Sequence, residues 1–247
     1  MRLVACSLVL FAACTQGDGD DYYTEPGGGG GSGTSSGTDA GGGDGSSAVI
    51  DGRVCGLSDI LVWDQCNSTG MDDMLVILEG VNSVPAPDGT FQIAAPTSSG
   101  ATWHVSGGNR VASLREYSGV LSIPSITNNQ YDDLLGETGV GLDATAGTVF
   151  AEVIYNAAPL AGAAGSIPNL PSLVHYDDPF GSSKFSLGDG VTRATGKIWF
   201  PNVTPGNVNI TVTPPGSVAG GVAQTKTVTV ERETVTFVTF IFQNAPQ

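Results

Sequence analysis

Only two histidines, His104 and His175, are available for acid–base chemistry or for binding a transition metal, and the most polar group of residues in the body surrounds His175. His175 is followed closely by Asp177 and Asp178, and Asp189 lies further along the same segment. Carboxylates are the hard oxygen ligands that Ca²⁺ prefers, although their spacing here does not match an EF-hand loop. Two interpretations stay open: a Ca²⁺ site at Asp177, Asp178 and Asp189 beside a reactive His175, or acid-rich surface turns. Apart from Ca²⁺, no cofactor is indicated.

The four cysteines divide between the N-terminal apolar segment and the body of the chain. Cys6 and Cys14 lie in the first group, and Cys55 and Cys66 form the remaining pair. In an exported protein such a pair is most simply a disulfide. Two thiolates with no His or Cys near them would leave a tetrahedral metal ion half coordinated, so we expect the disulfide.

The beginning of the chain has the layout of a secretory signal peptide. Met1 and Arg2 provide a positive start, and an apolar run over residues 3–11 precedes Ala12 and Ala13. This run is too short to span a bilayer, because about 20 apolar residues are needed. We therefore expect a signal peptide at residues 1–13.

The run "LFAAC", which ends at Cys14, resembles the bacterial lipobox, with Phe11 where a smaller residue is usual. The resemblance implies cleavage directly before Cys14 and a lipid on its thiol. Thr15 stands where an Asp would resemble the signal for retention in the inner membrane. The implied location is therefore the outer membrane, with the lipid as membrane anchor and the body facing the periplasm or the outside.

Residues 14–47 have a composition that cannot build a core. From residue 15 to residue 47 there are six acidic residues, no basic residue and an uninterrupted glycine run at 27–31. Glycine and serine leave such a segment a flexible coil. We expect a disordered Gly/Ser/Asp-rich tether between the lipid and the body.

The body is predicted to be all-β. Charged residues make up only 13% of the chain, too few for the polar faces of many surface helices. Val208, Ile210 and Val212 alternate with polar residues, which is the period-two pattern of a sheet with one buried face. Similar patterns in both halves predict one sandwich domain at 48–123 and a second at 147–247.

A short helix is expected in the connector at residues 124–146. Thr127 or Asn128 could cap it, and Tyr131, Leu134 and Leu135 would share one face. Because so short a helix is marginal by itself, we expect it to pack against a sandwich.

Three short motifs resemble those of carboxypeptidase-regulatory-like domains: "DGTF" at 88–91, "PLAGA" at 159–163 and "PGNV" at 205–208. The resemblance implies two tandem Ig-like, transthyretin-type β-sandwiches. It specifies architecture and not catalysis, because the zinc-binding peptidase domain that gives the family its name is absent.

Charge and motifs restrict the function. The net charge is −15, from 24 acidic and 9 basic residues, so the chain lacks the counter-charge for nucleic acid. No catalytic motif stands in a plausible context, so no enzymatic activity is expected. We predict a non-catalytic, lipid-anchored protein of the cell envelope with a structural, scaffolding or adhesive role.

The alternative is a glycan- or peptide-binding module displayed on the cell surface. Trp63, Trp103 and Trp199 could form exposed platforms for a glycan or protein ligand, since sandwich surfaces often carry such sites. The competing interpretation is that each indole fills the core.

Overall fold

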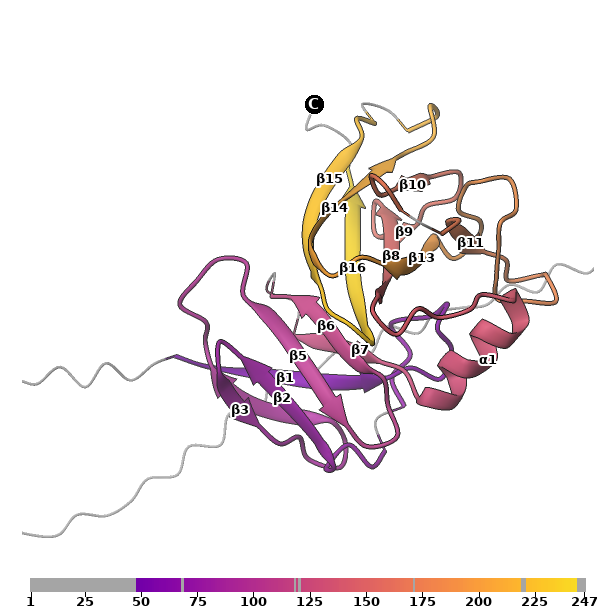
Figure 1. Cartoon of the computed structure of the whole chain (residues 1–247). Coiled ribbons are helices and arrows are strands. Elements are labelled where there is room, and N and C mark those ends of the chain that lie inside the picture. The colour runs from indigo at the N-terminus through magenta and orange to yellow at the C-terminus, as the bar shows by residue number, and fades with distance from the viewer. Residues whose placement is uncertain are drawn as a thin grey trace, which may run out of the picture. The chain divides into compact units, whose positions relative to one another are not determined.

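The computed structural model describes residues 48–67, 69–117, 119, 121–170, 172–218 and 221–243 (Figure 1). The expected signal peptide at 1–13, the lipid site Cys14 and the tether at 14–47 lie outside these residues. Within them the chain is mostly β-structure with one helix, which confirms the predicted β-rich class.

The described residues form sixteen strands and one helix. The strands before the helix are β1 (Val49–Gly56), β2 (Met74–Leu78), β3 (Val81–Ser83), β4 (Thr90–Ala94), β5 (Thr102–Gly107), β6 (Ala112–Glu116) and β7 (Ser122–Ser125). The helix is α1 (Asn128–Thr138). After it come β8 (Gly147–Tyr155), β9 (Ala158–Pro159), β10 (Ala164–Ser166), β11 (His175–Asp177), β12 (Phe185–Ser186), β13 (Lys197–Val203), β14 (Gly206–Thr213), β15 (Gln224–Val230) and β16 (Thr234–Phe242).

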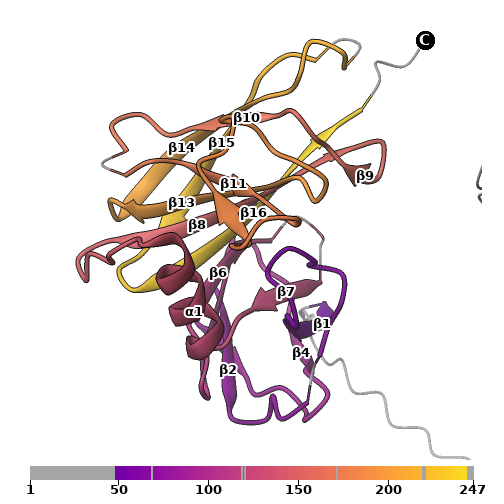
Figure 2. The same cartoon turned by 90° about the vertical axis from the view of Figure 1, so that its right-hand side faces the viewer.

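These strands are arranged in three sheets. In one small sheet β1 lies between β4 and β7, and in the other β14 lies between β10 and β15. The large sheet has the order β12-β11-β13-β8-β16-β6-β5-β2-β3, with β9 paired to β8. Figure 2 shows the β10–β14–β15 sheet lying over β13, β8 and β16.

The large sheet contains strands from both halves of the chain, which the sequence did not anticipate. β16 runs parallel to β6 over Thr234–Phe237 and parallel to β8 over Val235–Phe242. Most of its residues are buried on both faces, so an interior position in a sheet suits it. The division into two separate tandem sandwiches, with a boundary at 124–146, stays a prediction.

The two faces of β8, β13 and β16 are covered differently. The first, which we call the sandwich face, packs against the sheet of β14 and β15. Its residues include Val149, Ala151, Ile198, Phe200, Val238 and Phe240. The second, which we call the loop face, lies under residues 57–66 and α1. Its buried residues include Phe150, Trp199, Val235 and Phe237.

Helix α1 begins as the sequence predicts. Thr127 is the N-cap: its hydroxyl accepts from the backbone N–H of Gln130, and the Gln130 side chain reaches back to complete a capping box. Gly139 ends the helix in the left-handed region, with φ 68°. Tyr131 and Leu134 are buried in the loop-face core. No helix among the described residues is long and apolar enough to cross a bilayer.

Candidate functional site

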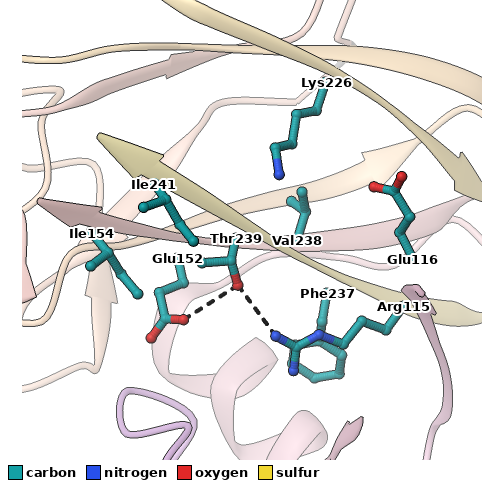
Figure 3. A pocket seen from close by; sticks show the side chains of 9 residues that line it. All are labelled: Arg115, Glu116, Glu152, Ile154, Lys226, Phe237, Val238, Thr239 and Ile241. Atoms are coloured by element: carbon teal, nitrogen blue, oxygen red, sulfur yellow. Dashed lines mark hydrogen bonds between the residues drawn. The ribbon is translucent and has the colours of Figure 1, made fainter. Parts of the chain in front are cut away.

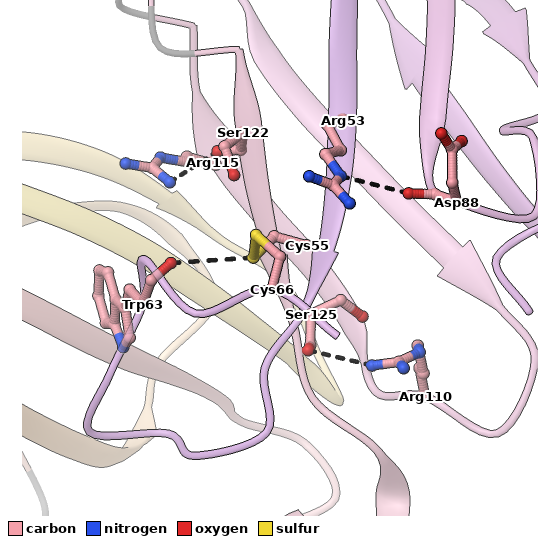
Figure 4. Close-up of a disulfide and its surroundings, with 9 residues drawn as sticks. All are labelled: Arg53, Cys55, Trp63, Cys66, Asp88, Arg110, Arg115, Ser122 and Ser125. Carbon is pink, nitrogen blue, oxygen red and sulfur yellow. Dashed lines mark hydrogen bonds between the residues drawn. A yellow bond between two sulfur atoms is a disulfide. The ribbon is translucent and has the colours of Figure 1, made fainter. Parts of the chain in front are cut away.

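The predicted disulfide between Cys55 and Cys66 is confirmed, with a Cα–Cα distance of 4.8 Å (Figure 4). Cys55 is the penultimate residue of β1, and Cys66 pairs through a β-bridge with Leu57. The bond therefore closes the irregular segment 57–65 into a loop, which we call the disulfide loop.

The disulfide loop packs over the loop face through Trp63. The indole N–H of Trp63 donates to the carbonyl of Ile60 at 2.8 Å, which fixes the ring. Its ring meets Phe237 edge-on at 5.1 Å between centroids. The Lys197 ammonium lies 4.9 Å from the same ring, within cation–π range. The loop thus covers both an aromatic core and a charge.

A row of polar side chains crosses four strands of this face. The strand register sets Lys197 and Thr239 opposite Glu152. Lys197 Nζ lies 2.7 Å from Glu152 Oε1, and Thr239 Oγ1 donates to Glu152 Oε2 at 3.4 Å. Arg115 donates through Nη2 to Thr239 Oγ1 at 3.4 Å and through Nη1 to the Ser122 carbonyl at 2.8 Å.

Burial sets the electrostatics of this row. The Lys197 side chain is 3% exposed and that of Glu152 18% exposed, so the two charges depend on each other. Burial lowers the pKa of Arg115, while the nearby Glu152 carboxylate opposes that shift. Because every member has a protein partner, the row holds strands together and is poorly placed to exchange protons with a substrate.

A pocket of about 340 Å³ lies where this row reaches the end of β6 (Figure 3). It surrounds the C-terminal part of β16 on both faces. Its lining residues are Arg115, Glu116, Glu152, Ile154, Lys226, Phe237, Val238, Thr239 and Ile241. Lys226 reaches it from β15, on the opposite side of β16 from Glu152 and Arg115 (Figure 3). This pocket is the candidate binding site of the described residues.

Among the histidine and aspartates selected from the sequence, Asp178 lines a separate pocket of about 350 Å³, together with Asp59, Glu137 and Lys184. His175 is buried against the Trp199 ring, with 5.0 Å between centroids, and burial lowers its pKa. Asp177 is fully buried and accepts hydrogen bonds from the backbone N–H groups of Arg193 and Thr195, both at 2.7 Å. This carboxylate therefore orders the chain segment before β13.

The predicted Ca²⁺ site is not assembled. Asp178 pairs with the Arg193 guanidinium at 2.6 Å and accepts from Ser186, whereas Asp189 lies on an exposed turn. Across the described ranges, no group of three or more His, Cys, Asp or Glu side chains is arranged to hold a metal ion. The surface-turn interpretation suits Asp189, while Asp177 and Asp178 have protein partners.

The expectation of exposed tryptophan platforms is wrong. Trp103 and Trp199 are fully buried and Trp63 is 7% exposed. Trp103 packs edge-on against Phe91 in the core of the first half, and Trp199 stacks with Phe150 on the loop face. The indoles fill the interior because large aromatic rings contribute most when both faces are covered.

An exposed aromatic side chain among the described residues was missed. Phe180 is 88% exposed in the loop between β11 and β12. Pro179 precedes it, and the Gly181 N–H donates to the Asp178 carbonyl at 3.0 Å to close a turn. The Pro-Phe-Gly sequence was the available signal, since Pro and Gly mark turns and connecting segments run over the surface.

No family model matches the chain, and no curated protein matches it. Among solved structures it is similar to a minor pilin of Streptococcus agalactiae, at 11% identity and a TM-score of 0.29 over 81% of this chain and 98% of that one. A streptococcal ancillary pilin aligns at 10% identity and a TM-score of 0.26, over 80% of this chain and 70% of that one. The major pilin subunit of Bacillus cereus aligns at 16% identity and a TM-score of 0.22, over 71% of this chain and 55% of that one.

Proposed function

We propose that this chain is a non-catalytic, lipid-anchored protein of the outer cell envelope with a structural or adhesive role. The observation that carries the proposal is the "LFAAC" run at the end of a signal-like segment, which resembles a lipobox and ends at Cys14. Acyl chains bind membranes by burying methylene groups, at about 0.8 kcal/mol each. Several chains on Cys14 would hold the protein permanently.

Two features of the folded body support this proposal. The Cys55–Cys66 disulfide suits an oxidising compartment outside the cytoplasm. The buried polar groups serve the fold: Asp177 orders the segment before β13, and Lys197 joins β13 to β8 through Glu152. A body built in this way suits a load-bearing or contact role.

The glycan-binding alternative rested on exposed tryptophans. Since Trp63, Trp103 and Trp199 are buried, that feature no longer supports it. Recognition of a peptide does not need an exposed indole.

Lipidation can be tested in a bacterial host with matched cysteine variants. Wild-type chain should incorporate labelled palmitate and accumulate as precursor when the lipoprotein signal peptidase is inhibited by globomycin. Cys14→Ala should lose the label and leave the membrane fraction. Cys6→Ala, in the same apolar segment, should behave as wild type. Retention of Cys14→Ala in the membrane fraction would contradict the proposal.

The side of the membrane is a separate measurement. If the body faces the outside, protease added to intact cells should degrade it, while a periplasmic control protein survives. Protection of both proteins would assign the body to the periplasm and turn the proposed role from adhesion to scaffolding.

A further inference from the structure

Strand β16 has an edge that is covered for only part of its length. On one side it pairs with β8 from Val235 to Phe242. On the other side it pairs with β6 from Thr234 to Phe237 only. Among the described residues, no strand pairs with Val238–Phe242 on the β6 side.

The direction of the backbone groups along this edge follows from two hydrogen bonds. The Phe242 carbonyl accepts from the Asn156 N–H at 3.2 Å, directly beyond β8, so it faces the paired side. The Ile241 carbonyl accepts from the Gln224 side chain at 2.8 Å, so it faces the open side. Because backbone groups alternate along a strand, the N–H and carbonyl of Thr239 face the open side as well.

The pocket at β16 lies along this open edge and extends to both faces of the strand (Figure 3). Thr239 and Ile241 line one face together with Ile154. Val238 lines the other face together with Lys226. Successive side chains of a strand point to opposite faces of the sheet. The side chains of a strand added here would therefore contact pocket residues on both faces.

The charges around the pocket select one kind of side chain. Glu152 is neutralised by Lys197 at 2.7 Å, so the charged side chains left to line the pocket are the carboxylate of Glu116 and the two cations Arg115 and Lys226. Lys226 takes part in none of the ion pairs among the described residues, and its ammonium lies 5.7 Å from the Phe240 ring. In a chain of net charge −15, this cation is available to an acidic group.

We propose that the open edge of β16 binds an extended peptide segment of another protein by strand addition. Backbone groups of the segment bond the N–H and carbonyl of Thr239 and the N–H of Ile241, whose carbonyl keeps its bond from Gln224. An acidic side chain of the segment meets Lys226, and an aliphatic one packs against Ile154 and Ile241. An unpaired edge is a template for such pairing. The end of β6 limits the added strand to a short one. The proposal goes beyond anchoring and stands whether or not Cys14 carries a lipid.

Binding is tested with the purified full chain in detergent and a short synthetic peptide of alternating Val and Thr with one central Glu. The peptide should bind and slow hydrogen exchange at the amides of Thr239 and Ile241. The same peptide with Pro in place of its central Val and Thr should not bind, because it cannot form the ladder. Equal binding of both peptides, or no binding of either, would overturn the proposal.

Ile241→Pro removes the edge N–H without touching the β8 ladder, and edge strands tolerate proline. It should weaken peptide binding by roughly tenfold, the effect of a lost backbone hydrogen bond. Ile241→Val keeps the N–H and should bind as wild type. Equal unfolding midpoints for both variants confirm that the fold is intact, and equal peptide binding by them would overturn strand addition.

Reversing the charge tests the role of Lys226. Lys226→Glu should weaken binding of the Glu peptide by roughly fivefold, the effect of an exposed ion pair, and favour a peptide with Lys in its place. If Lys226→Glu still preferred the Glu peptide to the Lys peptide as wild type does, the pairing of an acidic side chain with Lys226 would be overturned. If sedimentation instead shows a dimer that Ile241→Pro dissociates, and no peptide binds, the occupant is a second copy and the proposal is wrong.

Discussion

The two faces of the same three strands are closed by different means. On the sandwich face, regular strands of a second sheet supply apolar side chains such as Ile210 and Val228. On the loop face, the cover is an irregular loop and a short helix, and the interior includes the Lys197–Glu152 pair. A regular cover needs only alternating apolar residues, whereas an irregular one needs specific bonds: a disulfide, a capping box and a buried ion pair.

This comparison predicts that the loop face depends on its disulfide and the sandwich face does not. Phe237 belongs to the loop face and Phe240 to the sandwich face, and both are essentially fully buried. Either change to Ala should cost about 3–5 kcal/mol of unfolding free energy because it leaves a cavity. Urea denaturation measures both.

Reduction of the disulfide should change the stability cost of Phe237→Ala but not that of Phe240→Ala. Loss of the Cys55–Cys66 bond should itself cost roughly 2–3 kcal/mol. In the reduced protein the cost of Phe237→Ala should fall by about 1 kcal/mol, because its edge-on pair with Trp63 is already loosened. The cost of Phe240→Ala should stay the same. An equal fall for both variants would contradict the proposed independence of the two faces.

The next effect concerns the buried pair. Glu152→Ala leaves the Lys197 ammonium buried without its carboxylate and should cost about 3 kcal/mol. The double change Glu152→Leu with Lys197→Met removes both charges and should recover most of that loss. A double-mutant cycle from urea midpoints gives the interaction free energy between Glu152 and Lys197. If the double variant is as unstable as the single one, the pair contributes shape and not charge.

The sandwich face was largely predictable from the sequence. The alternation of Val208, Ile210 and Val212 is borne out in β14, where Ile210 and Val212 are fully buried. The helix cap at Thr127 and the Cys55–Cys66 disulfide were also correct, since each follows from a local or compositional rule.

The loop face was not predictable in the same way. Residues 57–65 have no periodicity, so nothing in them indicates that they cover a sheet or bury Trp63. The pairing of β16 with β6 joins segments that are far apart in the sequence, and alternation states only which residues share a face. For the same reason the tryptophans were misplaced: strand patterns do not show which face another segment covers.

The helix offers a smaller test of the same irregular cover. Thr127→Ala removes the side-chain half of the capping box and should cost about 1 kcal/mol of unfolding free energy. Asn129→Ala, an exposed position in the same helical turn, should change stability by less than about 0.5 kcal/mol. Equal effects would mean that α1 is held by Tyr131 and Leu134 alone.

The smallest expected effect is a dependence on pH that belongs to the loop face. His175 packs on Trp199, and its buried Nδ1 has no hydrogen-bond partner among the described residues. Burial lowers the pKa of His175 below its usual 6.5, so the unfolded chain takes up this proton more readily than the folded one. The contribution of neutral His175 to the unfolding free energy is therefore fully present above pH 6.5, and it is lost as the pH falls through the pKa of His175 in the folded chain.

Unfolding free energies measured at stepwise lower pH should therefore fall more steeply for wild type than for His175→Gln. His104→Gln serves as the control, because His104 is 40% exposed on β5 and lies 3.7 Å from Glu231. Parallel curves for wild type and His175→Gln would mean that the loop face admits a proton as easily as the unfolded chain does. Its aromatic interior would then be as open to water as a surface loop, and the contrast with the sandwich face would be lost.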